Sequence, residues 1–111
     1  MYYTSYFSNP ILKTIDNSLL RPITYKLPSW SKYVWYPQFA PSEKLVKQYK
    51  SGWLDESEYY GNVLRFITKE EVIDTLPDES VLLCFEKPPK FCHRHLVSEW
   101  LNSVGLECKE L

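Results

Sequence analysis

The chain has 111 residues, of which 44% are hydrophobic, 16% aromatic and 24% charged, and its formal net charge is −1. This composition indicates a globular protein with room for one hydrophobic core, and it excludes a disordered chain. The first residues, MYYTSYF, carry no basic segment, and no long apolar stretch follows them. We therefore expect neither a secretion signal nor a membrane span, and we expect a cytosolic protein.

The first third of the chain contains two candidate strands. Residues 2–7, YYTSYF, are mostly aromatic or β-branched and are followed by the turn residues Ser8-Asn9-Pro10. Residues 23–27, ITYKL, alternate apolar with polar side chains up to Pro28, which predicts a second and less buried strand. The proline-bounded segment 28–37 is expected to be an aromatic loop.

The middle of the chain predicts three helices. Pro41 suits the first position of a helix, and Gly52 can end that helix in the left-handed conformation. Asp55 and Thr68 are each followed three residues later by a glutamate, which is the capping-box pattern of a helix start. The expected helices span residues 41–52, 55–67 and 68–77.

The last third predicts a β-α-β unit. Residues 80–85, SVLLCF, form a continuous apolar run, which is typical of a strand buried on both faces. Apolar residues then recur with a helical period up to residue 104, and residues 106–111 can return as a strand. We therefore predict one α/β domain over residues 1–111, with a Rossmann-like three-layer arrangement, a mostly parallel sheet of about four strands, and about four or five helices.

Ligands of parallel sheets bind outside the carboxyl ends of the strands, so the residues that follow the predicted strands are candidates for a site. The densest group is the stretch EKPPKFCHRHL, which links the buried strand to the last helix. The candidate ligand-binding residues at this edge are Ser8, Asn9, Ser29, Trp30, Lys87 and Arg94, and the candidate reactive residues are Glu86, Cys92 and His93.

The closing segment LLCFEKPPKFCHRHLVSEWL resembles the signature of the domain of unknown function 488 family, in which an LLCxE strand precedes a CHR helix start. The segments YTSYFSN, LRPITYKLPSW and FAPS are similar to those of its short bacterial and phage members, so the resemblance covers nearly the whole chain. The larger family usually has Asp-Val-Arg after its second strand, where this chain has Ile23-Thr24-Tyr25-Lys26. The resemblance implies an α/β fold with its site at the closing motif, and it assigns no activity.

Cys92 is the candidate nucleophile. A cysteine in the first turn of a helix meets the positive end of the helix dipole, and the adjacent His93 and Arg94 also favour the thiolate. In this interpretation His93 is the base and Glu86 the orienting carboxylate. The alternative is that Cys92 is a small buried packing residue, as Cys84 and Cys108 are expected to be.

Arg94 and Lys87 could bind a phosphate or carboxylate, because a helix start offers N–H donors and an arginine offers a bidentate fork. The alternative is a buried salt bridge between Glu86 and Arg94 that locks the loop to the helix. Cys92 and His95 have the spacing of metal ligands on one helix face, and Glu86 or His93 could add to them. The paired spacing of a zinc site is absent, however, so we predict no metal and no cofactor.

The sequence predicts an anionic ligand at the Cys92–Arg94 helix start, such as a nucleotide or a nucleic-acid fragment, with catalysis as a further option. Trp30 is expected to lie near this ligand and to stack on a base, whereas Trp35 is expected in the core. The near-zero net charge argues against broad, nonspecific nucleic-acid binding. The competing hypothesis is a non-enzymatic module in which the motif is structural and the aromatic loop meets a protein partner.

Overall fold

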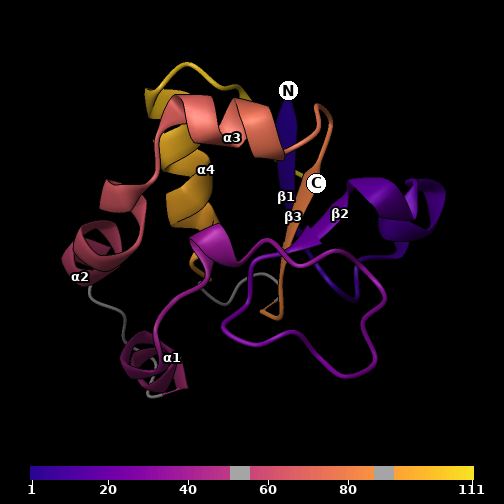
Figure 1. Ribbon diagram of the computed structural model, residues 1–111. Coiled ribbons are helices and arrows are strands. Elements are labelled where there is room, and N and C mark those ends of the chain that lie inside the picture. Colours follow the sequence, from indigo (N-terminus) through magenta and orange to yellow (C-terminus); the bar gives the residue numbers. More distant parts are fainter. Residues whose placement is uncertain (51–55, 87–91) are drawn as a thin grey trace.

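A parallel four-stranded sheet forms the centre of the protein (Figure 1). The computed structural model describes residues 1–50, 56–86 and 92–111. The strands are β1 (Tyr2–Tyr6), β2 (Leu20–Pro22), β3 (Val81–Cys84) and β4 (Cys108–Glu110), and their order in the sheet is β2-β3-β1-β4. All three strand pairings are parallel, so the carboxyl ends of the strands share one edge. The predicted fold class is confirmed.

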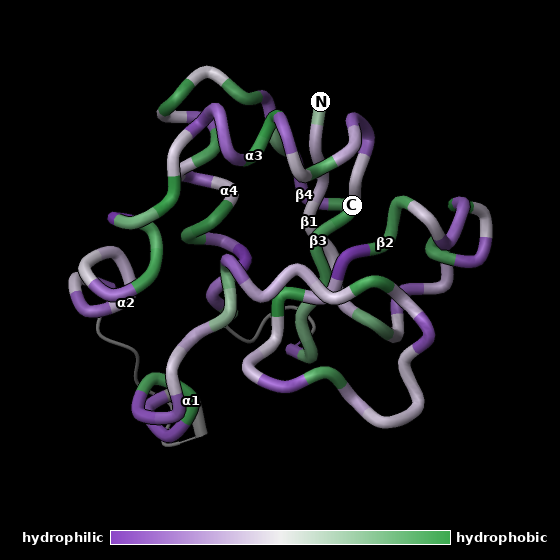
Figure 2. Tube along the Cα trace, viewed as in Figure 1, coloured by the Kyte–Doolittle hydropathy of each residue, from purple (hydrophilic) through white to green (hydrophobic). Residues whose placement is uncertain are grey.

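β3 is buried on both faces, as its apolar run predicts, and it appears as a hydrophobic segment in Figure 2. Successive side chains of a strand point to opposite faces. Leu82 and Cys84 accordingly belong to the larger core cluster, and Val81 and Leu83 to the smaller one. The sheet therefore separates two cores, which gives the fold its layers.

In the described part of the chain, every α-helix contributes to the larger core, and the 3-10 helix Pro10–Thr14 covers the smaller one. The α-helices are α1 (Glu43–Lys50), α2 (Glu56–Asn62), α3 (Lys69–Thr75) and α4 (Arg94–Ser103). Leu12, from the 3-10 helix Pro10–Thr14, packs with Val81 and Leu83 on the opposite face. Figure 1 shows α3 and α4 on one side of the strands and the segment of residues 10–19 on the other.

The predicted helix start at Thr68 agrees with the structure, whereas α1 begins at Glu43, two residues after the expected start at Pro41. Thr68 caps α3, because its side-chain oxygen accepts a hydrogen bond from the Glu71 backbone N–H at 3.1 Å. Ser42 makes the same kind of bond to Leu45, at 3.3 Å, at the start of α1. The expected Asp55 cap lies outside the described residues.

The prediction of a second strand over residues 23–27 is wrong, because the strand occupies the three residues before it. The Ile23 N–H still donates to the Leu83 carbonyl at 3.0 Å, but the chain then bends at residues 24–26. The Thr24 hydroxyl donates to the Lys26 carbonyl at 2.7 Å, which closes a local turn that competes with strand pairing. Pro22 suits the observed strand, since β2 lies at an edge of the sheet.

No helix in the part of the chain that the structure describes combines the length and apolar character needed to cross a membrane.

Tyr59 provides a test of the packing between the helices and the loop before α1. Its fully buried hydroxyl donates to the Phe39 carbonyl at 2.8 Å. We expect Tyr59→Phe to lower the free energy of unfolding by about 1–3 kcal/mol, because the buried carbonyl loses its partner. Urea denaturation measures this change. Tyr60→Phe, at the partly buried neighbouring position, is the control and should change stability much less; an equal loss in both variants would contradict the prediction.

Candidate functional site

A cavity of about 330 Å³ lies at the carboxyl edge of the sheet, where the sequence predicts the ligand site. Its wall is built from three segments that are distant in the sequence: residues 24–28 after β2, residues 84–86 at the end of β3, and residues 92–93 at the start of α4. Pro41 and Val46 complete the described part of the wall. Cys92, His93 and Glu86 therefore share one cavity.

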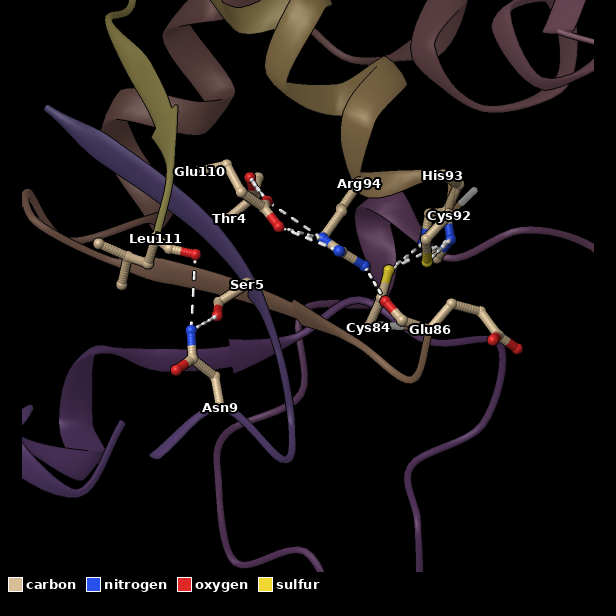
Figure 3. A network of polar contacts seen from close by, with 10 residues as sticks. All are labelled: Thr4, Ser5, Asn9, Cys84, Glu86, Cys92, His93, Arg94, Glu110 and Leu111. Atoms are coloured by element: carbon tan, nitrogen blue, oxygen red, sulfur yellow. Dashed lines mark hydrogen bonds and ion pairs between the residues drawn. The ribbon is translucent and has the colours of Figure 1, made fainter. Parts of the chain in front are cut away.

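Two cysteines face the imidazole of His93 on this wall. Nδ1 of His93 lies 3.4 Å from Sγ of Cys84 and 3.7 Å from Sγ of Cys92. All three residues are buried, and Figure 3 shows both sulfur atoms turned toward the ring. Sequence reasoning missed Cys84, because an apolar strand run reads as packing and gives no sign that its last residue meets the helix start.

The Ile23 carbonyl fixes the tautomer of His93. It lies 2.7 Å from Nε2, and since a carbonyl can only accept, Nε2 carries the proton. Nδ1 is then the atom that exchanges a proton or offers a lone pair, and it lies within 3.7 Å of both sulfurs. The ring of Tyr59 packs against the imidazole, with 5.6 Å between the ring centroids. The imidazole is thus held by a hydrogen bond on one edge and by an aromatic contact.

The surroundings of the two thiols push their pKa values apart. Burial opposes ionisation of Cys92, but hydrogen bonds from Cys84 and His93, the charge of His93 and the backbone N–H of Arg94 lower the pKa of Cys92 to about 3. Burial, together with the neighbouring Cys92, raises the pKa of Cys84 well above its ordinary value. The pair therefore holds one thiolate, on Cys92, next to one protonated thiol.

Arg94 pairs with Glu110 and not with Glu86. The Arg94 side chain has no exposed surface, and its Nε and Nη2 donate to the Glu110 carboxylate at 3.0–3.1 Å. Nη1 donates to the backbone carbonyl of Glu86, whose carboxylate points away from the guanidinium (Figure 3). The predicted Glu86–Arg94 salt bridge is therefore wrong. Sequence reasoning missed Glu110, which only the pairing of β4 with β1 brings to this place.

The other predicted ligand residues do not line the described cavity wall. Ser8 is exposed, and Asn9 caps the 3-10 helix Pro10–Thr14 and donates to Ser5 at 3.0 Å. Ser29 and Trp30 follow the cavity-lining Pro28 and are exposed. Arg94 faces Glu110, and Lys87 lies outside the described residues. His95 is not part of the cysteine–histidine group, although its spacing from Cys92 suggested a metal ligand.

Trp35 is not a core residue, so that expectation is wrong. Its side chain is 36% exposed, and its Nε1–H donates to the Thr24 carbonyl at 3.0 Å. This bond holds the aromatic loop against the segment that forms the cavity wall. Trp35 therefore stabilises the cavity-lining segment at Thr24 without lining the cavity itself.

The fold and the site define a small α/β protein with a cysteine–histidine centre at the carboxyl edge of a parallel sheet. A family model described as "Domain of unknown function DUF488" matches residues 24–101, and the chain belongs to this family. The matched segment includes the cavity wall and the Cys92-His93-Arg94 motif. Comparisons with curated proteins and with solved structures gave no match.

The Arg94–Glu110 pair gives a direct test of the corrected salt bridge. We expect Glu110→Ala to lower the free energy of unfolding by about 1.5–3 kcal/mol, because it leaves the buried guanidinium without its carboxylate while water can reach the partly exposed position of Glu110. Glu86→Ala should stay within about 0.5 kcal/mol, since Arg94 contacts only the backbone at that residue. Urea denaturation of both variants measures the difference. A larger loss in Glu86→Ala than in Glu110→Ala would instead identify Glu86 as the partner of Arg94.

Proposed function

We propose that the protein binds a small anionic ligand of the nucleotide or nucleic-acid-fragment class in the cavity, with Cys92 and His93 as its reactive centre. One observation carries the proposal: a cavity large enough for a small molecule has both residues of the cysteine–histidine pair in its wall. The three free cysteines favour a reducing compartment, so we place this activity in the cytosol.

Lys26 supports the anionic character of the ligand. Lys26 is exposed to solvent and also lines the cavity, so its ammonium group can contact a phosphate at the cavity entrance. The start of α4 plays another part, because the backbone N–H of Arg94 acts on the thiolate of Cys92. The anion-binding role therefore moves in our proposal from Arg94, which is paired with Glu110, to Lys26.

An aromatic row leads from the cavity to the surface and supports a ligand with a flat ring. Phe85 lines the cavity and is 55% exposed; its ring centroid lies 5.2 Å from that of Phe7. Phe7 in turn meets Trp30 edge to face at 5.1 Å, and Trp30 is 63% exposed. Bases stack readily on such rings. A nucleotide can thus place its base on this row and its phosphate near Lys26.

The reactive step follows from the protonation states of the pair. Nδ1 of His93 first takes the thiol proton of Cys92. The Cys92 thiolate attacks an electrophilic carbon or phosphorus of the ligand and forms a covalent bond to it. The displaced group then leaves with the electron pair of the broken bond and takes that proton from Nδ1. Nε2 keeps its proton and its hydrogen bond to the Ile23 carbonyl throughout, so the orientation of the ring does not change. Glu86, on the same wall, orients the ligand.

The second candidate is a non-enzymatic module that binds a protein partner. The observation in its favour is the exposure of apolar side chains in the aromatic loop, where Trp30 and Val34 are both more than 60% exposed. In this reading the cysteine–histidine group only stabilises the fold. Reactivity of Cys92 and binding of phosphate-bearing compounds separate the two candidates.

We expect Cys92 to react fastest of the three cysteines with iodoacetamide at pH 7 in reduced, EDTA-treated protein. Cys92 combines a place on the cavity wall with a thiolate, whereas Cys84 is protonated and Cys108 lies in β4 outside the described wall. Peptide mass mapping after brief treatment measures the order. The fast phase should vanish in Cys92→Ser and persist in Cys108→Ser. Labelling of Cys92 at or below the rate of Cys108 would mean an inert, packed sulfur.

The ligand class is tested by thermal shift with nucleoside phosphates and short single-stranded oligonucleotides, followed by calorimetry. Lys26→Ala should weaken binding of the best compound, whereas Lys13→Ala, in the 3-10 helix Pro10–Thr14, should not. Trp30→Ala should cost about 1–3 kcal/mol of binding free energy. The same variant should change stability by no more than about 1 kcal/mol, because the side chain is mostly exposed. If none of these compounds raises the Tm, the interaction module becomes the better candidate.

A further inference from the structure

We propose that Cys84, Cys92 and His93 form a zinc site whose fourth coordination position faces the cavity. The proposal goes beyond the ligand binding proposed above and does not depend on it. Local sequence pattern did not predict this site, because the candidate metal ligands were Cys92 and His95 with Glu86 or His93, and Cys84 was expected to be a packing residue. The structure instead brings Cys84, at the end of β3, to the residue pair that starts α4.

The ligand atoms already have the spacing that one ion requires. The two Sγ atoms and a ring nitrogen of His93 all lie within 4.8 Å of one another. Tetrahedral zinc, with Zn–S of about 2.3 Å and Zn–N of about 2.0–2.1 Å, separates sulfur from nitrogen by about 3.6 Å. The observed separations from Nδ1 are 3.4 Å and 3.7 Å. These distances suit a shared ion, which binds once side-chain rotation turns the Nδ1 lone pair toward it.

The hydrogen bond to Ile23 prepares His93 for this role. Metal-bound histidines commonly donate their second ring N–H to a backbone carbonyl or a carboxylate, which fixes the tautomer and turns the lone pair to the ion. His93 donates Nε2–H to the Ile23 carbonyl at 2.7 Å, which leaves the lone pair on Nδ1. Nδ1 is also the ring nitrogen nearer to Sγ of Cys84, at 3.4 Å against 3.8 Å for Nε2.

The donor set indicates the ion and the kind of site. Two thiolates and an imidazole are borderline-soft ligands that suit Zn²⁺, and three protein ligands with an open position are typical of catalytic zinc. Among the described residues, no other His, Cys, Asp or Glu joins the set. All three ligands line the cavity, so the open position is directed to the space that a ligand would occupy. When zinc is bound, Cys92 is a metal ligand rather than a nucleophile. The anionic group of a molecule in the cavity then binds the ion.

Cobalt substitution tests the site directly. The full chain, kept reduced with a phosphine and stripped of metal with a chelator, is titrated with Co²⁺. We expect thiolate-to-cobalt charge-transfer bands in the near ultraviolet and the visible bands of four-coordinate cobalt, saturating at one equivalent. Zn²⁺ should displace the cobalt and bleach these bands, because such sites prefer zinc. Absence of charge-transfer bands in the folded, reduced protein would overturn the proposal.

Variants assign the ligands. Cys84→Ser and Cys92→Ser should each lose about half of the charge-transfer intensity, and His93→Gln should weaken Co²⁺ binding by more than the roughly 10- to 100-fold that loss of an outer-shell partner costs. Cys108→Ser, a buried cysteine outside the group, is the matched control and should bind like the wild type. Zn²⁺ should likewise protect Cys84 and Cys92, but not Cys108, from alkylation. Wild-type spectra in Cys92→Ser and Cys84→Ser would contradict the assignment.

The open position has its own test. Inorganic phosphate added to the cobalt-loaded protein should shift the visible bands, since it can replace the solvent ligand on the cavity side. Unchanged bands at saturating phosphate would overturn the open position and leave a closed, structural ion. Metal binding in this series and ligand binding by metal-free protein are measured separately, so either can fail while the other stands.

Discussion

The ion pair between the fully buried Arg94 and the partly exposed Glu110 is the constraint on which the site depends. Arg94 begins α4, and its guanidinium binds a carboxylate of β4 and the backbone carbonyl of Glu86 after β3. One side chain therefore holds the helix start against the ends of two strands. Because a buried charge that loses its partner is costly, α4 cannot slide along the sheet without a large loss of stability. Cys92 and His93 immediately precede this anchor, so their positions are fixed with it.

A second anchor connects the same helix start to β2. The Ile23 carbonyl accepts a hydrogen bond from His93 instead of continuing the strand ladder. The chain then turns away through Thr24, whose carbonyl is held by the indole of Trp35. The hydrogen bond between His93 and Ile23 thus marks the end of β2 and fixes the tautomer of His93. The neighbouring bond from Trp35 holds Thr24 in the cavity wall.

The chemistry proposed for the site comes from this preorganisation. A thiolate is both a nucleophile and a metal ligand, and its surroundings decide which role it takes. Here Cys92 lies beside Cys84 and beside the imidazole of His93, whose Nδ1 is within 3.7 Å of both sulfurs. The cavity beside them has a cation, Lys26, and an aromatic row that begins at Phe85. The site can therefore combine recognition of an anion with a reactive or metal-binding centre.

The sequence by itself determined the parts of this protein that depend on local pattern. The apolar run of β3 and the β-α-β order predict the parallel sheet, the Thr68 cap predicts the start of α3, and the sheet places the Cys92-His93 motif at its carboxyl edge. These features follow from hydrophobic periodicity and capping, which act over a few residues. Only the tertiary structure decided which distant residues meet there: Cys84 rather than His95 beside Cys92, and Glu110 rather than Glu86 beside the arginine. Those partners depend on strand register and on the direction of each side chain, which no local pattern of residues encodes.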